Sequence, residues 1–301
     1  MDTLNAASGG PYPGHRAVHA KGTVCKGTFT PTPEASKLSR AAHFQGDPVE
    51  VTVRFSNASG DPDTSDAHPI AGRGMAVKFH LPDGSETDIV SVPLVVFMVR
   101  TAEDFLAFTR ARVPDPETGH PDPEKLGAFL GEHPETGIAI QKSMGKLAPT
   151  TSFATSDYRA IHAFCLIDAE GDRHWGRYVW EPEAGTEYLA DEQRESAPRD
   201  YLQKEIRERL GSGIARFTLE FTLAHEDDPL DDPTHEWEGE REVVELGELE
   251  VTEVVEDPET PDEPLVFDPM RLTDGIEPSD DPILAARPKA YSVSIDRRCD
   301  V

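Results

Sequence analysis

Short runs rich in Val, Phe and Thr, separated by turns rich in Gly, Pro and Asp, recur along this chain and are typical of β-strands. The pair Asp83-Gly84 stands between two of these runs and is a strong signal for an antiparallel hairpin. The predicted strands are 24–30, 49–56, 74–80, 88–100, 159–168, 173–180, 214–224 and 243–253. This pattern favours an antiparallel β-barrel.

Three segments between the strands read as helices: 101–112, 123–132 and 198–211. Thr101 is a suitable N-cap for the first of them, and acidic residues follow it at the positive end of the helix. The chain has 301 residues, and single β-barrel domains of this size are common. We therefore expect an α+β protein, an antiparallel β-barrel with surrounding helices, in one domain over residues 1–301.

The charge balance excludes several classes of partner. Lys and Arg total 29 against 57 Asp and Glu, a formal net charge of -28. Such a surface repels a nucleic-acid backbone and an anionic membrane, so neither is expected as a partner. An acid excess of this size also keeps a protein hydrated in concentrated salt, where screening relieves self-repulsion. A salt-rich environment is therefore a hypothesis from charge.

The cysteines and the first residues indicate a compartment. The three cysteines, Cys25, Cys165 and Cys299, form no close pair, which argues against a disulfide framework or a structural zinc site. The first ten residues lack a basic segment followed by an apolar run, and no stretch of the chain is long enough to span a membrane. We expect a cytoplasmic protein.

Two segments near opposite ends of the chain carry the residues suited to chemistry. Arg287 precedes Tyr291 by one helical turn, so its positive charge lies on the same face and favours the phenolate, a good ligand for ferric iron. Residues 16–22 read Arg-Ala-Val-His-Ala-Lys-Gly and contain His19. Histidine is the side chain best suited to taking up and returning a proton near neutral pH.

These motifs together resemble the catalase superfamily of haem enzymes, and the small catalase-related peroxidases within it, in which a tyrosine is the proximal iron ligand. The resemblance implies a barrel enclosing haem b, with His19 as the distal acid/base and Tyr291 as the ligand to the iron. It extends to the strand 51–56, which follows a Gly-Asp-Pro turn at residues 46–48.

Further residues take expected roles from the same resemblance. Ser56 is expected to hydrogen-bond and orient His19. The arginines expected to contact haem are Arg16, Arg54 and Arg298 at the propionates and Arg287 beside the tyrosine, and arginine suits carboxylates because it forms paired, charge-assisted hydrogen bonds. Phe105 falls where the family stacks an aromatic ring on the haem, although plain core packing is an equal alternative.

The proximal segment has two further features. Pro282 is well placed to open the helix that carries Tyr291, whereas Pro288 lies inside it and predicts a later start or a bend. His162 lies in a strand that resembles the family's, where it could line the haem edge, but a structural role is the favoured interpretation.

One position departs from the family's pattern. The run 88–100 resembles the strand that supplies a distal asparagine, and the asparagine position falls on Val92. Losing one oriented donor typically costs on the order of 10²-fold or more in rate. The departure favours peroxidase over catalase activity.

The function expected is therefore a haem-dependent peroxidase that reduces hydrogen peroxide or an organic hydroperoxide with a small organic electron donor, with weak catalase activity. Two alternatives stay open: a fatty-acid hydroperoxide isomerase or lyase of catalase-like fold, and a haem-binding protein without turnover. The resemblance also favours a homo-oligomer, at least a dimer. No glycine-rich dinucleotide fingerprint is present.

Overall fold

The computed structural model describes residues 1–68, 72–115, 117–256, 258 and 264–299. Its strands are β1 (Gly22–Pro31), β2 (Val49–Asn57), β3 (Arg73–His80), β4 (Glu86–Ser91), β5 (Tyr158–Arg159), β6 (Phe164–Ile167), β7 (Arg173–Pro182), β8 (Ala215–Leu223), β9 (Val243–Val254) and β10 (Ile276–Pro278). Its α-helices are α1 (Asp2–Ala7), α2 (Ala35–Leu38), α3 (Ala102–Ala111), α4 (Pro123–Glu132), α5 (Pro134–Leu147), α6 (Asp191–Ser196), α7 (Tyr201–Ser212) and α8 (Pro282–Cys299).

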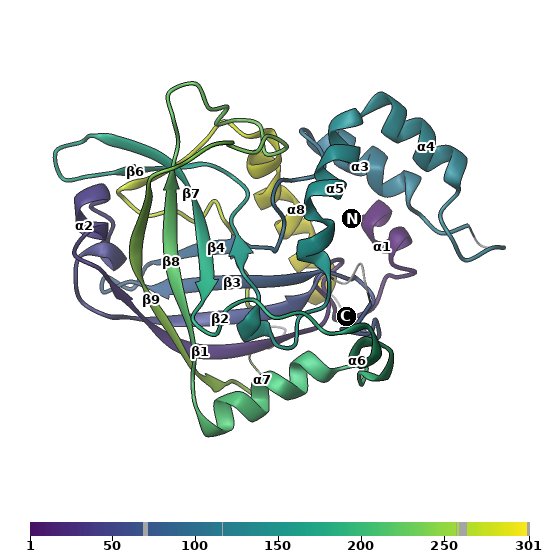
Figure 1. Ribbon diagram of the computed structural model, residues 1–301, viewed down its shortest axis with the longest axis horizontal. Coiled ribbons are helices and arrows are strands. Elements are labelled where there is room, and N and C mark those ends of the chain that lie inside the picture. The colour runs from purple at the N-terminus through teal and green to yellow at the C-terminus, as the bar shows by residue number, and fades with distance from the viewer. Residues whose placement is uncertain (69–71, 116, 257, 259–263, 300–301) are drawn as a thin grey trace.

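All the strands join one curled antiparallel sheet, in the order β10-β6-β7-β8-β9-β1-β2-β3-β4, with β5 paired to β7 (Figure 1). The chain just beyond β4, at one edge of the sheet, also pairs with β5. Val92, just beyond β4, exchanges backbone hydrogen bonds of 3.0 and 2.8 Å with Arg159 of β5. The expected α+β fold built on an antiparallel barrel is therefore confirmed, and Val92 takes part in its closure.

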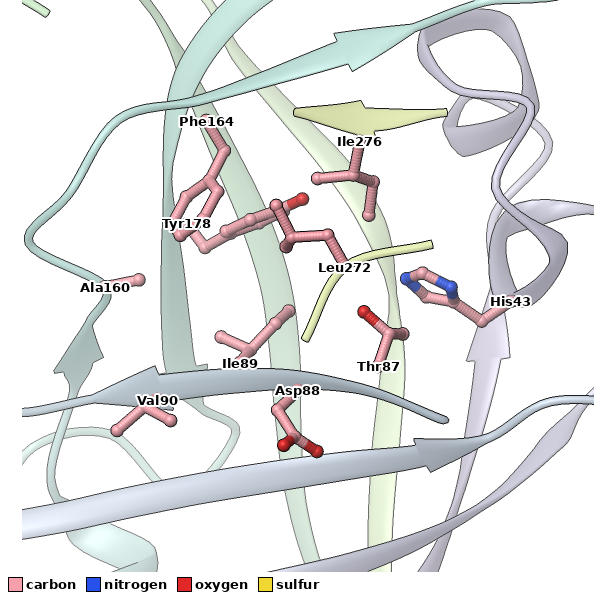
Figure 2. A pocket seen from close by; sticks show the side chains of 10 residues that line it. All are labelled: His43, Thr87, Asp88, Ile89, Val90, Ala160, Phe164, Tyr178, Leu272 and Ile276. Carbon is pink, nitrogen blue, oxygen red and sulfur yellow. The ribbon is translucent and has the colours of Figure 1, made fainter. Parts of the chain in front are cut away.

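The interior of the barrel is packed with aromatic and aliphatic side chains. Phe29 stands edge-on to Phe79 and to Trp180, at ring-centroid distances of 5.2 and 6.2 Å. A small cavity of about 10 Å³ lies in this interior. Figure 2 shows the side chains that line it, with the ring of His43 at one side. The volume of this cavity is about that of one water probe, so this part of the interior is closely packed.

The helices lie outside the sheet. In Figure 1, α3, α4 and α5 form a group at one side, α1 lies against α3, and α8 runs between this group and the sheet. α7 lies along the opposite side and contacts β9. None of the helices in the described ranges has both the length and the apolar character needed to cross a membrane.

Several predicted bounds hold and others are wrong. The helices predicted at 101–112 and 123–132 are α3 and α4 to within a residue at each end, and Thr101 caps α3 by accepting a hydrogen bond from the Asp104 amide. The strand predicted over 88–100 ends at Ser91 in β4, because Pro93 has no N–H to continue a ladder.

Three further differences between the predicted and the observed elements concern their number and their bounds. The strand predicted over 159–168 divides into β5 and β6, both of which pair with β7. Helix α5 was not predicted, because its exposed Ile138 and Met144 interrupt the apolar periodicity that identifies a helix. α7 begins at Tyr201, after Pro198, within the predicted range 198–211.

Candidate functional site

His19 lies at the start of the barrel, three residues before β1. Its amide donates to the Ala58 carbonyl at 3.3 Å, and its φ is 54°, in the left-handed region that residues other than glycine rarely adopt. Such backbone strain persists only where surrounding contacts impose it, and it gathers at functional sites. The loop at residues 57–60 therefore holds the His19 backbone in place.

Strand pairing brings Ser56 to His19 from far along the chain. β1 and β2 are antiparallel and pair Gly22 with Ser56, so the end of β2 lies beside the segment that leads into β1. The expected hydrogen bond between His19 Nδ1 and Ser56 Oγ is present at 2.8 Å. Ser56 Oγ also donates, at 3.5 Å, to the carbonyl of Gly74, its partner on β3.

These contacts accommodate the tautomer of His19 that carries its proton on Nδ1. A serine hydroxyl has one proton, and when Ser56 gives it to the Gly74 carbonyl, His19 Nδ1 donates to Ser56 and Nε2 keeps its lone pair. The nitrogen that remains basic is the one turned away from Ser56. This is the form of histidine that a general base requires.

Gly74 makes the room that this arrangement needs, and the sequence did not single it out. A Cβ at Gly74 would lie 2.7 Å from His19 Cε1 and 2.9 Å from both His19 Nδ1 and Ser56 Oγ. Contacts that short essentially never occur, so a side chain there would displace His19 or Ser56. A lone glycine inside a predicted strand is a signal of close approach, and it could have been read so.

Positive charge surrounds His19. Burial, and after it the charges of Arg54, Arg287 and Arg16 in that order, together lower the pKa of His19 to about 3. Part of the side chain stays open to solvent, but the ring lies deep among protein atoms and cations. At neutral pH His19 is therefore uncharged and able to accept a proton.

The three arginines expected at the propionates come from distant parts of the chain. Arg16 and Arg298 both donate to the Leu265 carbonyl, at 2.8 and 3.4 Å. Arg54 donates to the His19 carbonyl at 2.9 Å. The structure thus brings Arg16 and Arg298 together, and it places Arg54 beside His19.

Tyr291 and Arg287 belong to a hydrogen-bonded chain of four side chains. Arg287 Nε donates to Tyr291 Oη at 2.8 Å, and Arg287 Nη1 lies 3.1 Å from His162 Nε2. His162 Nδ1 in turn lies 2.6 Å from Asp281 Oδ2. The helical spacing of Arg287 and Tyr291 is as expected, whereas Asp281 and the link through His162 were not predicted.

The chemistry of arginine orients this chain of bonds. A guanidinium only donates, so His162 Nε2 accepts and its Nδ1–H donates to the Asp281 carboxylate. Burial is the main cause that lowers the pKa of His162, and the Arg287 charge acts in the same direction. His162 is thus a neutral, fully bonded link that holds the Arg287 guanidinium at the tyrosine oxygen.

Asp281 also begins α8. Its Oδ1 accepts from the amides of Ile283 and Leu284 at 2.8 and 3.3 Å, and Pro282 takes the first helical position, as expected. The later start that Pro288 predicted is wrong, because α8 runs through Pro288 from Pro282. One carboxylate therefore caps the helix and joins the chain of bonds to Tyr291.

Phe105 packs in a second apolar cluster. Its ring stacks on Phe97 at a centroid distance of 5.6 Å, and it stays partly exposed. Core packing is therefore observed for Phe105, and its haem-stacking role stays a prediction. Val92 contributes its backbone to barrel closure, and its side chain is half-buried.

The residues present fit a haem. A tyrosine oxygen would hold the iron of a ferric haem, and guanidinium groups would hold its propionates. The guanidinium of Arg287 lies 2.8 Å from Tyr291 Oη. The guanidiniums of Arg16 and Arg298, from near the two ends of the chain, both donate to the Leu265 carbonyl. Among the described residues, no group of three or more His, Cys, Asp or Glu forms a site for a bare metal ion.

Comparison with known proteins agrees with this geometry. The chain is 39% identical over 294 residues to a catalase-related peroxidase of Mycolicibacterium paratuberculosis. The alignment covers 98% of this chain and 92% of that protein. It is 34% identical over 285 residues to a catalase-related peroxidase of Synechococcus elongatus, covering 95% of this chain and 84% of that protein.

Larger catalases match over part of their length. The structure superposes on a fungal catalase with a TM-score of 0.83 at 23% sequence identity, covering 94% of this chain and 59% of the fungal chain, which shows a shared fold. The sequence profile of the Catalase family matches residues 13–300. The chain therefore belongs to the catalase family of oxidoreductase enzymes.

Proposed function

We propose that this chain is a haem b-dependent peroxidase that reduces hydrogen peroxide or an organic hydroperoxide with a small organic electron donor. Two groups of hydrogen-bonded side chains carry the proposal, one around His19 and one around Tyr291. His19 is kept neutral by burial and by the surrounding arginines and is oriented by Ser56, and Tyr291 is bonded to Arg287 at the end of a partly buried chain of hydrogen bonds. Two relatives named catalase-related peroxidase support the same function.

Each residue has a defined task in this proposal. When bound, haem supplies the iron that accepts oxidising equivalents from peroxide. Tyr291 Oη is the ligand, and Arg287 holds a positive charge beside it. Arg16, Arg54 and Arg298 are the partners for the propionates, and Phe105 the stacking ring.

His19 moves the proton. Reducing a peroxide to water requires a group that takes a proton from one oxygen and returns it to the other. His19 Nε2 has the free lone pair for the first step, and Ser56 keeps the ring in the orientation that presents it. The surrounding arginine charges favour rapid return of the proton, because they destabilise the charged ring.

The test is the ultraviolet–visible spectrum of the purified, haem-loaded protein before and after a small excess of hydrogen peroxide. We expect a high-spin ferric tyrosinate spectrum that changes with peroxide and returns when a phenolic donor is added. Tyr291→Phe should lose the tyrosinate spectrum, and the matched Tyr188→Phe, at a tyrosine that is 38% exposed, should keep it.

Other outcomes identify other functions. Unchanged peroxide reactivity in His19→Ala would support a haem-binding protein without turnover. Isomerised or cleaved products from a lipid hydroperoxide, with no donor consumed, would support the isomerase or lyase. A folded protein that takes up no haem overturns the proposal.

A further inference from the structure

A cavity lies between the N-terminal segment and α8. Its volume is about 420 Å³, within the range of pockets that hold small molecules. One wall contains His15 and Ala17, which flank Arg16 and lie within four residues of His19. The opposite wall contains Ser294, one helical turn beyond Tyr291. The cavity therefore borders both segments that carry the proposed catalytic residues.

The walls favour a flat apolar ring. Tyr12 lines the cavity together with its sequence neighbours Pro11 and Pro13, and Ala6 and Ala17 add small apolar surfaces. The side chain of Tyr12 is fixed by a hydrogen bond, because its hydroxyl donates to the Ser8 carbonyl at 3.2 Å. A fixed aromatic wall stacks on another aromatic ring at little entropic cost, and such pairs are worth about 0.5–1.5 kcal/mol beyond area burial.

The polar groups of the cavity favour a neutral ligand with a hydroxyl. Arg297 forms an ion pair with Asp2, so the charges of these two side chains compensate each other. Ser294 and His15 offer groups that can donate to or accept from a hydroxyl. An anionic ligand would also approach against a formal net charge of -28.

We propose that this cavity binds a small neutral phenol, which serves as the electron donor of the enzyme. The proposal rests on the proposed peroxidase function. Each phenol gives up one electron and its hydroxyl proton and leaves as a phenoxyl radical. Two phenols thus convert one hydrogen peroxide into two waters, which balances both electrons and protons.

The first test is binding of 4-methylphenol to the haem-loaded protein, measured by isothermal titration and by saturation-transfer NMR without peroxide. Tyr12→Ala should weaken binding about tenfold, because it removes the stacking wall, whereas Tyr12→Phe should keep it. Ala6→Trp should abolish binding by filling the cavity. Ala128→Trp, at an exposed alanine of α4, is its control and should bind like the unaltered protein.

The second test separates the site from the reaction. With hydrogen peroxide present, Ala6→Trp should raise the KM for 4-methylphenol at least tenfold and leave the KM for peroxide unchanged. If phenol is oxidised with an unchanged KM in Ala6→Trp, the site is wrong and the peroxidase function stands. If phenol binds as expected but peroxide oxidises no donor, the peroxidase function is wrong.

Two further results overturn the proposal. Binding of 4-methylphenol only to haem-free protein would show that haem excludes it from the cavity. Loss of linoleic acid hydroperoxide binding in Ala6→Trp, with phenol binding unaffected, would assign the cavity to an acyl chain instead.

Discussion

At the scale of single residues, the site depends on side chains whose protonation is set by burial and neighbouring charge. His19 and His162 are each kept neutral. Arg287 fixes the tautomer of His162, because a guanidinium can only donate, and Ser56 accommodates a His19 that donates through Nδ1. Arg287 acts on both proposed catalytic residues, because it donates a hydrogen bond to Tyr291 and its charge also lowers the pKa of His19. The two proposed catalytic residues thus share one charged neighbour.

Val92 gives a prediction about activity at this scale. Val92→Asn should raise peroxide disproportionation about tenfold or more in the haem-loaded protein, because it restores an amide donor at the family's position. The backbone bonds between Val92 and Arg159 do not depend on the side chain, so barrel closure should survive. Val92→Thr is the control without an amide. Unchanged oxygen release from a folded, haem-loaded Val92→Asn would show that the missing donor is not what limits catalase activity.

His43 gives a prediction about pH. Burial lowers its pKa to about 3 from 6.5, and its Nδ1 has no hydrogen-bond partner. Below pH 6.5 the unfolded chain binds a proton at this histidine that the folded protein does not, so stability falls as pH falls toward 3. The loss is about 1.4 kcal/mol per pH unit once pH is well below 6.5.

Denaturant titrations at several pH values check this. His43→Leu should remove that part of the acid loss, whereas His120→Leu, at an exposed histidine, should leave the pH dependence unchanged. Parallel stability curves for His43→Leu and the unaltered protein would contradict the assignment.

At the scale of elements, α8 and the strands β1 to β3 place the site. β2 pairs with both β1 and β3, so Ser56 meets Gly22 on one side and Gly74 on the other. Helix α8 carries Arg287, Tyr291 and Arg298 on one continuous helix. Its beginning is set by a carboxylate that also bonds to His162.

Asp281→Ala tests this double role. It removes the N-cap of α8, worth about 1 kcal/mol, and leaves the buried His162 Nδ1–H unpaired, which costs about 1–3 kcal/mol. We expect a loss of about 2–4 kcal/mol in the free energy of unfolding. Urea denaturation measures it. The neighbouring Asp280 is exposed, so Asp280→Ala should be nearly neutral, and equal effects of the two variants would refute the role of Asp281.

At the scale of the whole molecule, the ends of the chain meet. Arg16 and Arg298 share the Leu265 carbonyl, and Arg297 pairs with Asp2 near the N-terminus. That one domain spans residues 1–301 stays a prediction. The proposed site nevertheless needs both ends, because its proposed base and its proposed iron ligand lie 272 positions apart at His19 and Tyr291.

The net charge of -28 gives a prediction at this scale. Added potassium chloride should raise the melting temperature, because screening weakens repulsion between exposed carboxylates. Each 1 kcal/mol gained corresponds to about 2 °C for a chain of this size. Glu220 and Glu245 face each other across β8 and β9, and burial together with Glu245 raises the pKa of Glu220.

The matched variant is Glu245→Gln, which removes one repulsive pair. It should melt higher than the unaltered protein at low salt and gain less from added salt. Calorimetry over a range of salt concentrations decides this. A melting temperature that does not depend on salt would remove the hypothesis of a salt-rich environment.

The sequence alone determined what depends on local patterns and on motifs. Alternating apolar runs and the Asp83-Gly84 turn predict the strands, helical spacing puts Arg287 beside Tyr291, and the capping threonine predicts the start of α3. These features follow from neighbours within a few positions, where backbone geometry is regular.

Only the tertiary structure decided the contacts between distant residues. The bond from His162 to Asp281 spans 119 positions, and the closeness of Gly74 to His19 depends on the register of two strand pairs. The pairing of Val92 with Arg159 likewise follows from how the sheet curls, whereas the end of β4 at Ser91 has a local cause in Pro93. Packing and register are set by the whole fold, because they depend on which surfaces meet, and no local pattern contains that information.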